Sequence, residues 1–271
     1  MTSEATRSHD AGASAYDRFV GRWSRLYVPS LISAAGVAEG DSVLDVAAGT
    51  GEASVGLASL VGPAGRVLAV DLSRPMLSVA AGKVVGLPVR FAIMDGQRLA
   101  CRSRSLDAVV CQLGLMFFAE PLRGLEEFAR VLRPGGRIAL QVWSRTERVP
   151  HYGMLAVALS RELPAERDEL FRASAMADAD RLQALLARAG FSDVSVTPER
   201  RSVAFDSFED YWEAVEAGAS RIGQFYLGLP PGRRRAVREE VERGMAPFRS
   251  GGRLTLEAEA FIGRGVRRGD R

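Results

Sequence analysis

The spacing of hydrophobic side chains changes along this chain. Over the first 40 residues, apolar side chains recur at three- and four-residue steps, which is the spacing of one helix face. These positions are Tyr16, Phe19, Val20, Trp23, Leu26, Tyr27 and Leu31. Pro29 lies inside this pattern, and because proline lacks an amide hydrogen we expect it to interrupt or restart the helix. Residues 1–40 are therefore predicted to be a helical lead-in that could act as a lid.

Between residues 41 and 143, short apolar runs alternate with helical patterns. Continuous apolar strands that alternate with helices indicate a parallel sheet covered on both faces. The predicted strands are 42–46, 66–70, 89–94, 106–112 and 137–143. The predicted helices are 52–60, 75–85 and 122–132, the last of which is stopped by Arg133-Pro-Gly-Gly136.

Beyond residue 144 the alternation is looser. Helices are predicted at 152–163, 180–189, 208–222 and 233–245, and strands at 194–204 and 254–263. The last strand alternates apolar and polar residues, so we expect it at a sheet edge. Residues 205–252 interrupt the strand pattern as a helical insertion, and such an insertion can form a lid over a site.

Composition sets the broad class of protein. The chain has 271 residues, of which 47% are hydrophobic and 25% charged, enough for one core and an added subdomain. No apolar run is long enough to cross a membrane, and the polar start is unlike a signal peptide. Cys101 and Cys111 are too few for a disulfide framework or a zinc site. We therefore expect a cytoplasmic protein, a monomer or homodimer, with no membrane partner.

The basic residues do not indicate a nucleic-acid partner. The formal net charge is only +3, and nearly every basic residue is arginine. The clusters at 233–235 and 264–271 are not interleaved with aromatic side chains, so we interpret them as solvated surface.

A glycine turn after the first strand is the main chemical signal. In Val43-Leu-Asp-Val-Ala-Ala-Gly-Thr-Gly51, the glycines allow the backbone to approach a ligand, and the helix that follows directs free N–H groups at it. Asp71 closes the second strand, where a carboxylate can accept hydrogen bonds from ribose hydroxyls. A dinucleotide site prefers glycine where Ser54 stands. These features indicate a nucleoside ligand and leave a nicotinamide-dependent oxidoreductase open.

Four further motifs follow the turn in order. They are Val70-Asp-Leu-Ser-Arg-Pro-Met-Leu77, Met94-Asp-Gly-Gln97, Ser105-Leu-Asp-Ala-Val-Val-Cys-Gln112 and Val131-Leu-Arg-Pro-Gly-Gly136. With these motifs, residues 41–143 closely resemble the class I S-adenosylmethionine-dependent methyltransferases, particularly the branch related to quinone-biosynthesis C-methyltransferases. The resemblance implies an α/β, Rossmann-like, seven-stranded and mostly parallel sheet with an antiparallel edge strand and helices on both faces. Residues 41–204 and 253–271 would form the cofactor domain, and 205–252 the lid of the acceptor site.

The resemblance also implies which residues hold the methionine part of S-adenosylmethionine. Asp45 and the backbone of Ala47, Gly49 and Gly51 would bind it, with Ala47 standing where the family usually has glycine. Gln112, at the end of the fourth strand, would lie close to the reacting methyl group. The product would be S-adenosylhomocysteine.

The nucleoside part would be held by residues from the next two strands. Asp71 would bind the ribose hydroxyls, and Leu72 and Met76 would cover the adenine faces. Asp95 would accept from the adenine amino group, beside the Gly96 backbone.

The acceptor side has weaker signals. The sulfonium already activates the methyl group, so only a hydroxyl acceptor usually needs a base, and His151 is the candidate. Because no metal-binding cluster occurs in the sequence, a metal-dependent catechol methyltransferase is not favoured. Candidate acceptor-site residues are Tyr16, Trp23, Leu113, Phe117, Tyr211 and Trp212. The aromatic members of this set could equally be ordinary core.

The leading hypothesis is a methyltransferase acting at an oxygen, nitrogen or carbon of a small apolar or aromatic metabolite, as in secondary metabolism. One alternative is an NAD(P)-dependent oxidoreductase, although Lys83 is the only lysine and no Tyr-x-x-x-Lys pair occurs. The other alternative is a protein that binds S-adenosylmethionine without catalysis.

Overall fold

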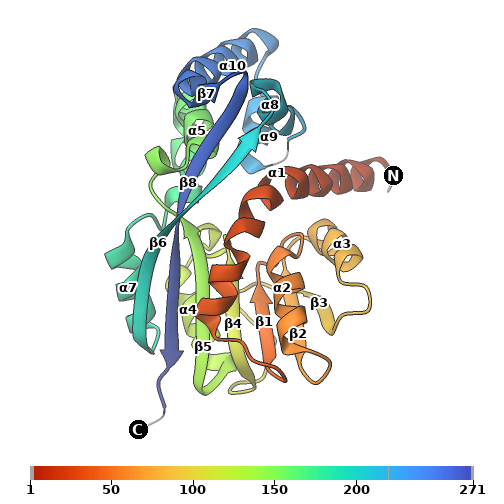
Figure 1. The fold of residues 1–271 in the computed structure, drawn as a ribbon, viewed down its shortest axis with the longest axis vertical. Coiled ribbons are helices and arrows are strands. Elements are labelled where there is room, and N and C mark those ends of the chain that lie inside the picture. The colour runs from red at the N-terminus through yellow and green to blue at the C-terminus, as the bar shows by residue number, and fades with distance from the viewer. Residues whose placement is uncertain (1–2, 219, 270–271) are drawn as a thin grey trace.

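The computed structural model describes residues 3–218 and 220–269, with side chains described from residue 12 onward. Residues 1, 2, 219, 270 and 271 lie outside the described part. One eight-stranded sheet runs through the molecule in the order β3-β2-β1-β4-β5-β8-β6, with β7 paired to β8 (Figure 1). The strands are β1 Ser42–Val46, β2 Arg66–Asp71, β3 Val89–Ile93, β4 Leu106–Gln112, β5 Leu132–Trp143, β6 Phe191–Phe205, β7 Arg249–Ser250 and β8 Arg253–Arg267. The first five are parallel, which confirms the mostly parallel α/β fold. The sheet has one strand more than the seven expected, because the two-residue β7 also pairs with β8.

The helices are distributed between the sheet and an upper helical part (Figure 1). They are α1 Ser3–Ala35, α2 Glu52–Val61, α3 Arg74–Lys83, α4 Pro121–Val131, α5 Pro150–Glu162, α6 Arg167–Leu170, α7 Ala179–Arg188, α8 Phe208–Glu216, α9 Arg221–Leu227 and α10 Pro231–Met245. Alternate residues of the central strands enter two separate cores, such as Val43 with Leu57 of α2, and Leu44 with Phe128 of α4. Helices therefore cover both faces of the sheet.

The prediction that the last strand lies at a sheet edge is wrong. β8 lies between β5 and β6, antiparallel to both, and β6 forms the edge. The pairing of β8 with β5 spans only Ala260 to Val266, whereas its pairing with β6 continues to Leu254. Alternating burial is confined to the half of β8 beyond the end of β5, where a two-stranded ribbon replaces the sheet. The alternation therefore reflects that ribbon and not an edge position.

α1 is a single helix with Pro29 inside it, so the expected interruption does not occur. Trp23, Tyr27 and Leu31 have no exposed area, and the Tyr27 hydroxyl donates to the Ala258 carbonyl at 2.6 Å. This packing outweighs the hydrogen bond that proline removes. Figure 1 shows α1 changing direction partway, so that its second half follows the sheet.

The insertion differs from the prediction in one element. Residues 208–222 form two helices, α8 and α9, because Gly218 adopts a φ of 62° and Ser220 caps α9 by accepting from the Gly223 amide. α5 packs with α10 through an ion pair of 2.6 Å between Arg161 and Glu240. The upper helical part therefore also includes α5.

Candidate active site

The carboxyl ends of the parallel strands border a cavity of about 920 Å³. The sheet side of its wall contains Asp71, Ser73 and Met76, from the end of β2 and the start of α3. The other sides are contributed by α1, the segment after β4, the start of α5 and the insertion. Ligands of open α/β sheets bind at this end of the strands.

The glycine turn after β1 has a left-handed backbone. Ala47, Gly49 and Gly51 have φ values of 55°, 54° and 87°. A Cβ on Gly51 would lie 2.8 Å from the Ala80 Cβ, so packing against α3 also requires glycine there. Ala47 carries the only Cβ among these three left-handed positions, and this conformation costs an L-residue about 1 kcal/mol.

We expect Ala47→Gly to raise the free energy of unfolding by roughly 0.5–1 kcal/mol, because glycine removes this strain. Urea unfolding at constant slope measures the change. The control is Ala48→Gly, at a neighbouring position without positive φ, which should destabilise the protein. A lower stability of Ala47→Gly would contradict the strain argument.

Asp45 lies fully buried beneath the turn. Its Oδ2 accepts a hydrogen bond of 2.5 Å from the Ser54 hydroxyl, whereas its Oδ1 is buried and has no partner among the described residues. Burial raises the pKa of Asp45 to about 7, opposed by the bond from Ser54. Ser54, which departs from the dinucleotide glycine pattern, therefore serves to orient Asp45. Sequence reasoning did not find this role.

This pKa predicts how stability depends on pH. The folded value of about 7 lies above the unfolded value of 3.8, so the native state retains a proton that the unfolded chain has lost. The contribution of Asp45 is complete below pH 3.8 and is lost as pH rises through 7. We expect the ligand-free protein to lose a few kcal/mol relative to Asp45→Asn between pH 4 and 8, measured by urea unfolding. Parallel pH curves for the two proteins would contradict this result.

Asp71 is oriented by two backbone amides. Its Oδ2 accepts from the Gly49 amide at 2.9 Å and its Oδ1 from the Ser73 amide at 2.8 Å. The remaining lone pairs of the carboxylate can accept from the two hydroxyls of a ribose. Leu72 beside it is 68% exposed, and Met76 lines the cavity, so both are available to an adenine ring.

Asp95 and Gly96 follow β3. The Asp95 Oδ1 accepts from the Gln97 amide at 2.9 Å, which fixes the loop. A Cβ on Gly96 would lie 2.5 Å from Phe118 Cζ and 2.7 Å from Val46 Cγ1. Packing therefore requires glycine at this position.

Gln112 does not line the cavity. Its Nε2 donates to the Ser24 carbonyl at 2.8 Å and to the Gln141 Oε1 at 2.9 Å, so it links α1 to β4 and β5. The next residue, Leu113, lines the cavity instead and has a φ of 53°. Gln112 thus positions α1 over the strand ends.

These residues fit S-adenosylmethionine. The Asp45 Oδ1 lacks a donor, which an ammonium group could supply. The space around Gly49 leaves room for backbone approach, and Asp71 is held in place to accept from hydroxyls. The ammonium group of the cofactor would therefore match the Asp45 Oδ1, and its ribose would match the Asp71 carboxylate.

A set of ion pairs fastens α1 to the helices that follow the turn. Lys83 at the end of α3 pairs with Asp17 of α1 and, at 2.5 Å, with Glu52 at the start of α2. Arg25 of α1 donates to the same Glu52 at 2.8 Å. The sole lysine of the chain therefore joins the lead-in helix to the glycine turn.

The structure divides the candidate acceptor residues into two groups. Tyr16, Leu113 and Phe117 line the cavity. Burial raises the pKa of Tyr16 to about 12, with smaller contributions from the charges of Asp71 and Asp17, so its phenol stays protonated.

Trp23, Tyr211 and Trp212 do not line the cavity, because they form the core behind its wall. Trp23 has no exposed area, and Tyr211 donates to the His151 carbonyl at 2.8 Å. Trp212 stacks on Phe208 with ring centroids 5.4 Å apart and is 3% exposed. These three residues were predicted to contact the acceptor, whereas in the structure they pack behind the wall of the cavity.

His151 lies in the wall of the cavity at the start of α5 and not in a surface loop. Its ring stacks on Trp23, with centroids 4.1 Å apart and an interplanar angle of 13°, and it meets Trp143 edge to face, with ring centroids 5.1 Å apart. Burial lowers the pKa of His151 to about 3. The imidazole is therefore neutral across the physiological pH range.

Other residues of the wall were not named individually from the sequence, although some belong to the lead-in helix and to the insertion that were expected to cover the site. They are Gly12, Ala13, Phe19, Val20, Ser73, Pro75, Met116, Trp143, Tyr152, Leu155, Glu169, Arg172, Ala173, Ala214, Val215, Gly218, Ser220, Arg221, Ile222 and Gln224. Those after residue 150 lie in segments that carry no motif. Only the aromatic spacing of the lead-in helix could have indicated Phe19.

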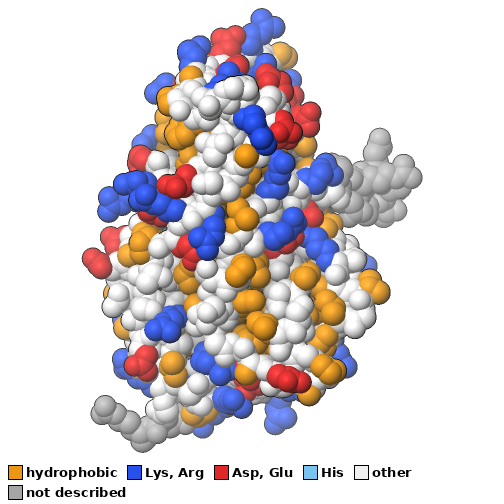
Figure 2. Space-filling model, in the orientation of Figure 1, with side chains coloured by type: hydrophobic (Ala, Val, Ile, Leu, Met, Phe, Trp, Pro, Cys, Tyr) orange, Lys and Arg blue, Asp and Glu red, His pale blue; other side chains and the backbone are white. Residues whose placement is uncertain are grey.

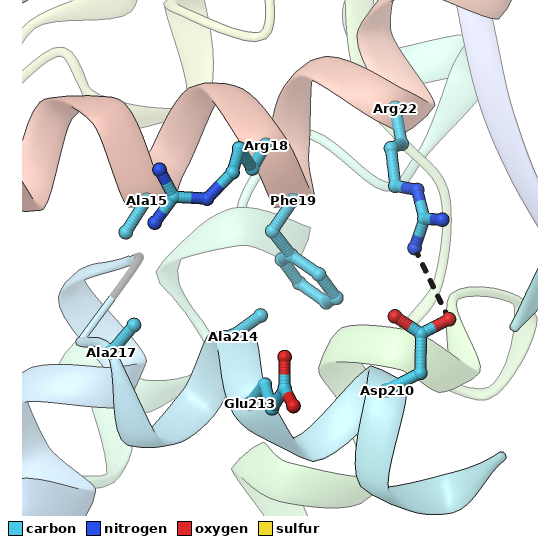
Figure 3. Close-up of a pocket in the computed structure, with 8 residues that line it drawn as sticks. All are labelled: Ala15, Arg18, Phe19, Arg22, Asp210, Glu213, Ala214 and Ala217. Atoms are coloured by element: carbon cyan, nitrogen blue, oxygen red, sulfur yellow. Dashed lines mark ion pairs between the residues drawn. The ribbon is translucent and has the colours of Figure 1, made fainter. Parts of the chain in front are cut away.

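A second cavity of about 560 Å³ lies between α1 and α8 (Figure 3). Figure 3 shows Arg22 pointing at Asp210, and their ion pair measures 3.6 Å. Phe19 and Ala214 line both cavities and so form part of the partition between them.

The chain is similar in sequence to known methyltransferases. Residues 43–136, which carry the turn and the motifs after it, match the model of a methyltransferase domain family. The chain is 30% identical over 207 residues to the ubiquinone/menaquinone biosynthesis C-methyltransferase of Hahella chejuensis, covering 69% of this chain and 83% of that protein. It is 40% identical over 147 residues to the demethylmenaquinone methyltransferase of Clavibacter sepedonicus, covering 52% and 58%.

The fold also has solved counterparts. Phosphoethanolamine N-methyltransferase 2 of Haemonchus contortus, in complex with phosphomonomethylethanolamine and S-adenosylhomocysteine, aligns with a TM-score of 0.60 and 17% identity, covering 96% of this chain and 58% of that one. A likeness at this identity shows the fold, and the sequence relatives show the family. The chain belongs to the class I S-adenosylmethionine-dependent methyltransferases.

Proposed function

We propose that this methyltransferase acts on a hydroxylated aromatic acceptor bound in the 920 Å³ cavity. The observation that carries the proposal is the apolar and aromatic wall beside Asp71 and Met76, contributed by residues such as Phe19, Leu113 and Phe117. The relatives named for quinone biosynthesis support an acceptor of this class.

The side chains of the protein position and shield the reactants. S-adenosylmethionine, when bound, supplies a methyl group that is already electrophilic. Asp71 would hold the ribose hydroxyls, and the glycine turn with Asp45 would hold the amino-acid part. The aromatic wall excludes water and orients the acceptor ring behind the methyl group.

His151 presents a neutral imidazole to this wall. This environment disfavours the predicted role as a base, because protonation would place a charge between Trp23 and Trp143. A hydrogen bond to an acceptor hydroxyl, made by the neutral ring, is compatible with burial.

This role has a pH signature. Since burial lowers the pKa of His151 to about 3, we expect the rate to show no inflection from this residue between pH 5 and 9. His151→Phe keeps a flat ring against Trp23, and we expect it to lower kcat by about tenfold for a hydroxylated acceptor. An inflection near pH 6.5 that His151→Phe removes would show a titrating base instead.

The test of the proposed function is incubation of the protein with isotopically labelled S-adenosylmethionine and a metabolite extract, followed by mass spectrometry. Label in an aryl methyl ether or in a ring-methylated hydroxylated aromatic product would support it, and label only in aliphatic amines would contradict it. Extracts prepared from cells that lack the gene for this chain enrich the unmethylated acceptor.

The setting of the protein stays a prediction in several respects. In the part of the chain that the structure describes, no helix has both the length and the apolar character to cross a membrane. Figure 2 shows basic and acidic side chains intermixed over the visible face. We retain the predictions of a cytoplasmic monomer or homodimer with no nucleic-acid partner, and size-exclusion chromatography with light scattering tests the oligomeric state.

A further inference from the structure

Three charged side chains in the cavity wall have no role in holding the cofactor. Glu169 belongs to α6, Arg172 to the short helical turn after it, and Arg221 to the start of α9. All three lie outside the motifs of the cofactor domain. Their position in the wall makes them available to the acceptor.

The three side chains form one charged group. The Glu169 Oε1 lies 2.8 Å from the Arg221 Nε, and its Oε2 lies 3.5 Å from the Arg172 Nη2. Across residues 12–218 and 220–269, Glu169 is the only ion-pair partner shown for either guanidinium. One carboxylate therefore faces two guanidinium groups, which leaves an excess of one positive charge.

Burial differs among the three side chains in a way that suits ligand binding. The Glu169 side chain is 24% exposed, whereas those of Arg172 and Arg221 are 39% and 68% exposed. The carboxylate is thus the anchored member, and the arginines retain accessible donors. The planar guanidinium fork is suited to a carboxylate, to which it can donate two parallel hydrogen bonds.

The two cavities differ in how their charges are arranged. The wall of the second cavity has Arg18 and Arg22 with Asp210 and Glu213. The main cavity also has two acidic and two basic side chains, but Asp71 lies on its sheet side, whereas the group of Glu169, Arg172 and Arg221 has one carboxylate for two guanidinium groups. The wall of the main cavity also has apolar members, among them Met116, Phe117 and Ile222. An apolar wall with a cationic group fits an apolar ligand with an anionic substituent.

We propose that the methyl acceptor carries a carboxylate on its aromatic or apolar body, bound by Arg172 and Arg221 while Glu169 holds both guanidinium groups in place. This inference rests on the proposed function, since it assigns the acceptor to the same cavity. It also separates this chain from an enzyme whose acceptor is an uncharged ring.

The test compares acids with their uncharged counterparts. The full-length protein is saturated with S-adenosylhomocysteine and titrated by calorimetry with hydroxylated aromatic carboxylic acids of one to three rings and with the corresponding primary amides. We expect at least one acid to bind about tenfold or more tightly than its amide, because hydrogen bonds to charged groups are stronger than neutral ones. If no acid of the panel binds more tightly than its amide, the proposal is wrong.

Variants assign the preference to the two arginines. The double variant Arg172→Gln/Arg221→Gln should bind acid and amide within about twofold of each other. Arg18→Gln, which removes an arginine from the second cavity, is the matched control and should keep the preference. A preference that survives in the double variant would overturn the assignment. Should the double variant fail to fold, Arg221→Gln alone, at the most exposed of the three side chains, must reduce the preference at least threefold.

The affinity for S-adenosylhomocysteine separates this inference from the proposed function. It should be unchanged in the double variant, because neither arginine belongs to the cofactor motifs. Normal cofactor affinity without acid preference would refute the anionic acceptor alone. Labelling of aliphatic amines only would instead refute the proposed function.

Discussion

Asp71→Ala is expected to lower the affinity for S-adenosylhomocysteine by about 100-fold or more. The carboxylate can accept from two ribose hydroxyls, and each such charge-assisted bond contributes about 1.5–3 kcal/mol. Alanine also leaves the Gly49 and Ser73 amides without the carboxylate to which they donate hydrogen bonds of 2.9 Å and 2.8 Å. The substitution therefore removes ligand contacts and loosens the glycine turn together. Calorimetric titration with S-adenosylhomocysteine measures the loss.

Asp107 provides the matched control for this experiment. Its carboxylate lies in β4, two strands away from β2 in the sheet and near the amino ends of the parallel strands, where it accepts from the Ser42 amide at 2.7 Å and pairs with Arg133 at 2.5 Å. Asp107→Ala should lower the unfolding midpoint while leaving cofactor affinity within about twofold. Equal affinity losses in the two variants would indicate a general effect of destabilisation and refute the ribose assignment.

The cofactor side could be predicted from the sequence because its parts are continuous. The turn from Ala47 to Gly51 directly follows a buried strand, and Asp71 ends the next strand in the sheet. Parallel neighbours bring their carboxyl ends together, so strand order alone places these residues at one edge. The local sequence was therefore sufficient to predict the arrangement of the cofactor side.

The acceptor side could not be predicted in the same way. Glu169 and Arg221 are brought together by the packing of helices 52 positions apart in sequence, and neither helix has a motif. The position of β8 was misjudged because alternation reports which faces are solvated and not which strand is the neighbour. Long-range packing decides both features.

The aromatic spacing of α1 did not show which side chains line a cavity and which lie in the core. Phe19 and Trp23 are four residues apart on α1, yet Phe19 lines both cavities and Trp23 lies behind the wall. A helix-face pattern identifies the buried side of a helix but does not say whether that side meets a cavity or a core. The partner helices α5 and α8 make the distinction here.

Trp23→Ala is expected to lower the free energy of unfolding by about 3–5 kcal/mol. The Trp23 side chain has no exposed area, and it stacks on His151 with ring centroids 4.1 Å apart. Its removal leaves a cavity between α1 and α5 and removes the indole ring that shields the His151 imidazole from water. The pKa of His151 should rise at the same time, because water can then reach the ring and burial no longer disfavours its charged form to the same extent. Urea unfolding and NMR titration of the imidazole measure the two effects.

Phe117→Ala distinguishes a core position from a wall position. The Phe117 side chain is 48% exposed and lines the cavity, so we expect its removal to change stability by less than about 1 kcal/mol. It should instead raise the KM for the acceptor, because the ring that would cover the acceptor is gone. The opposite pattern, with Trp23→Ala raising KM at unchanged stability, would place Trp23 in the acceptor site. The two variants together therefore decide which aromatic side chains bind the acceptor and which support the wall behind it.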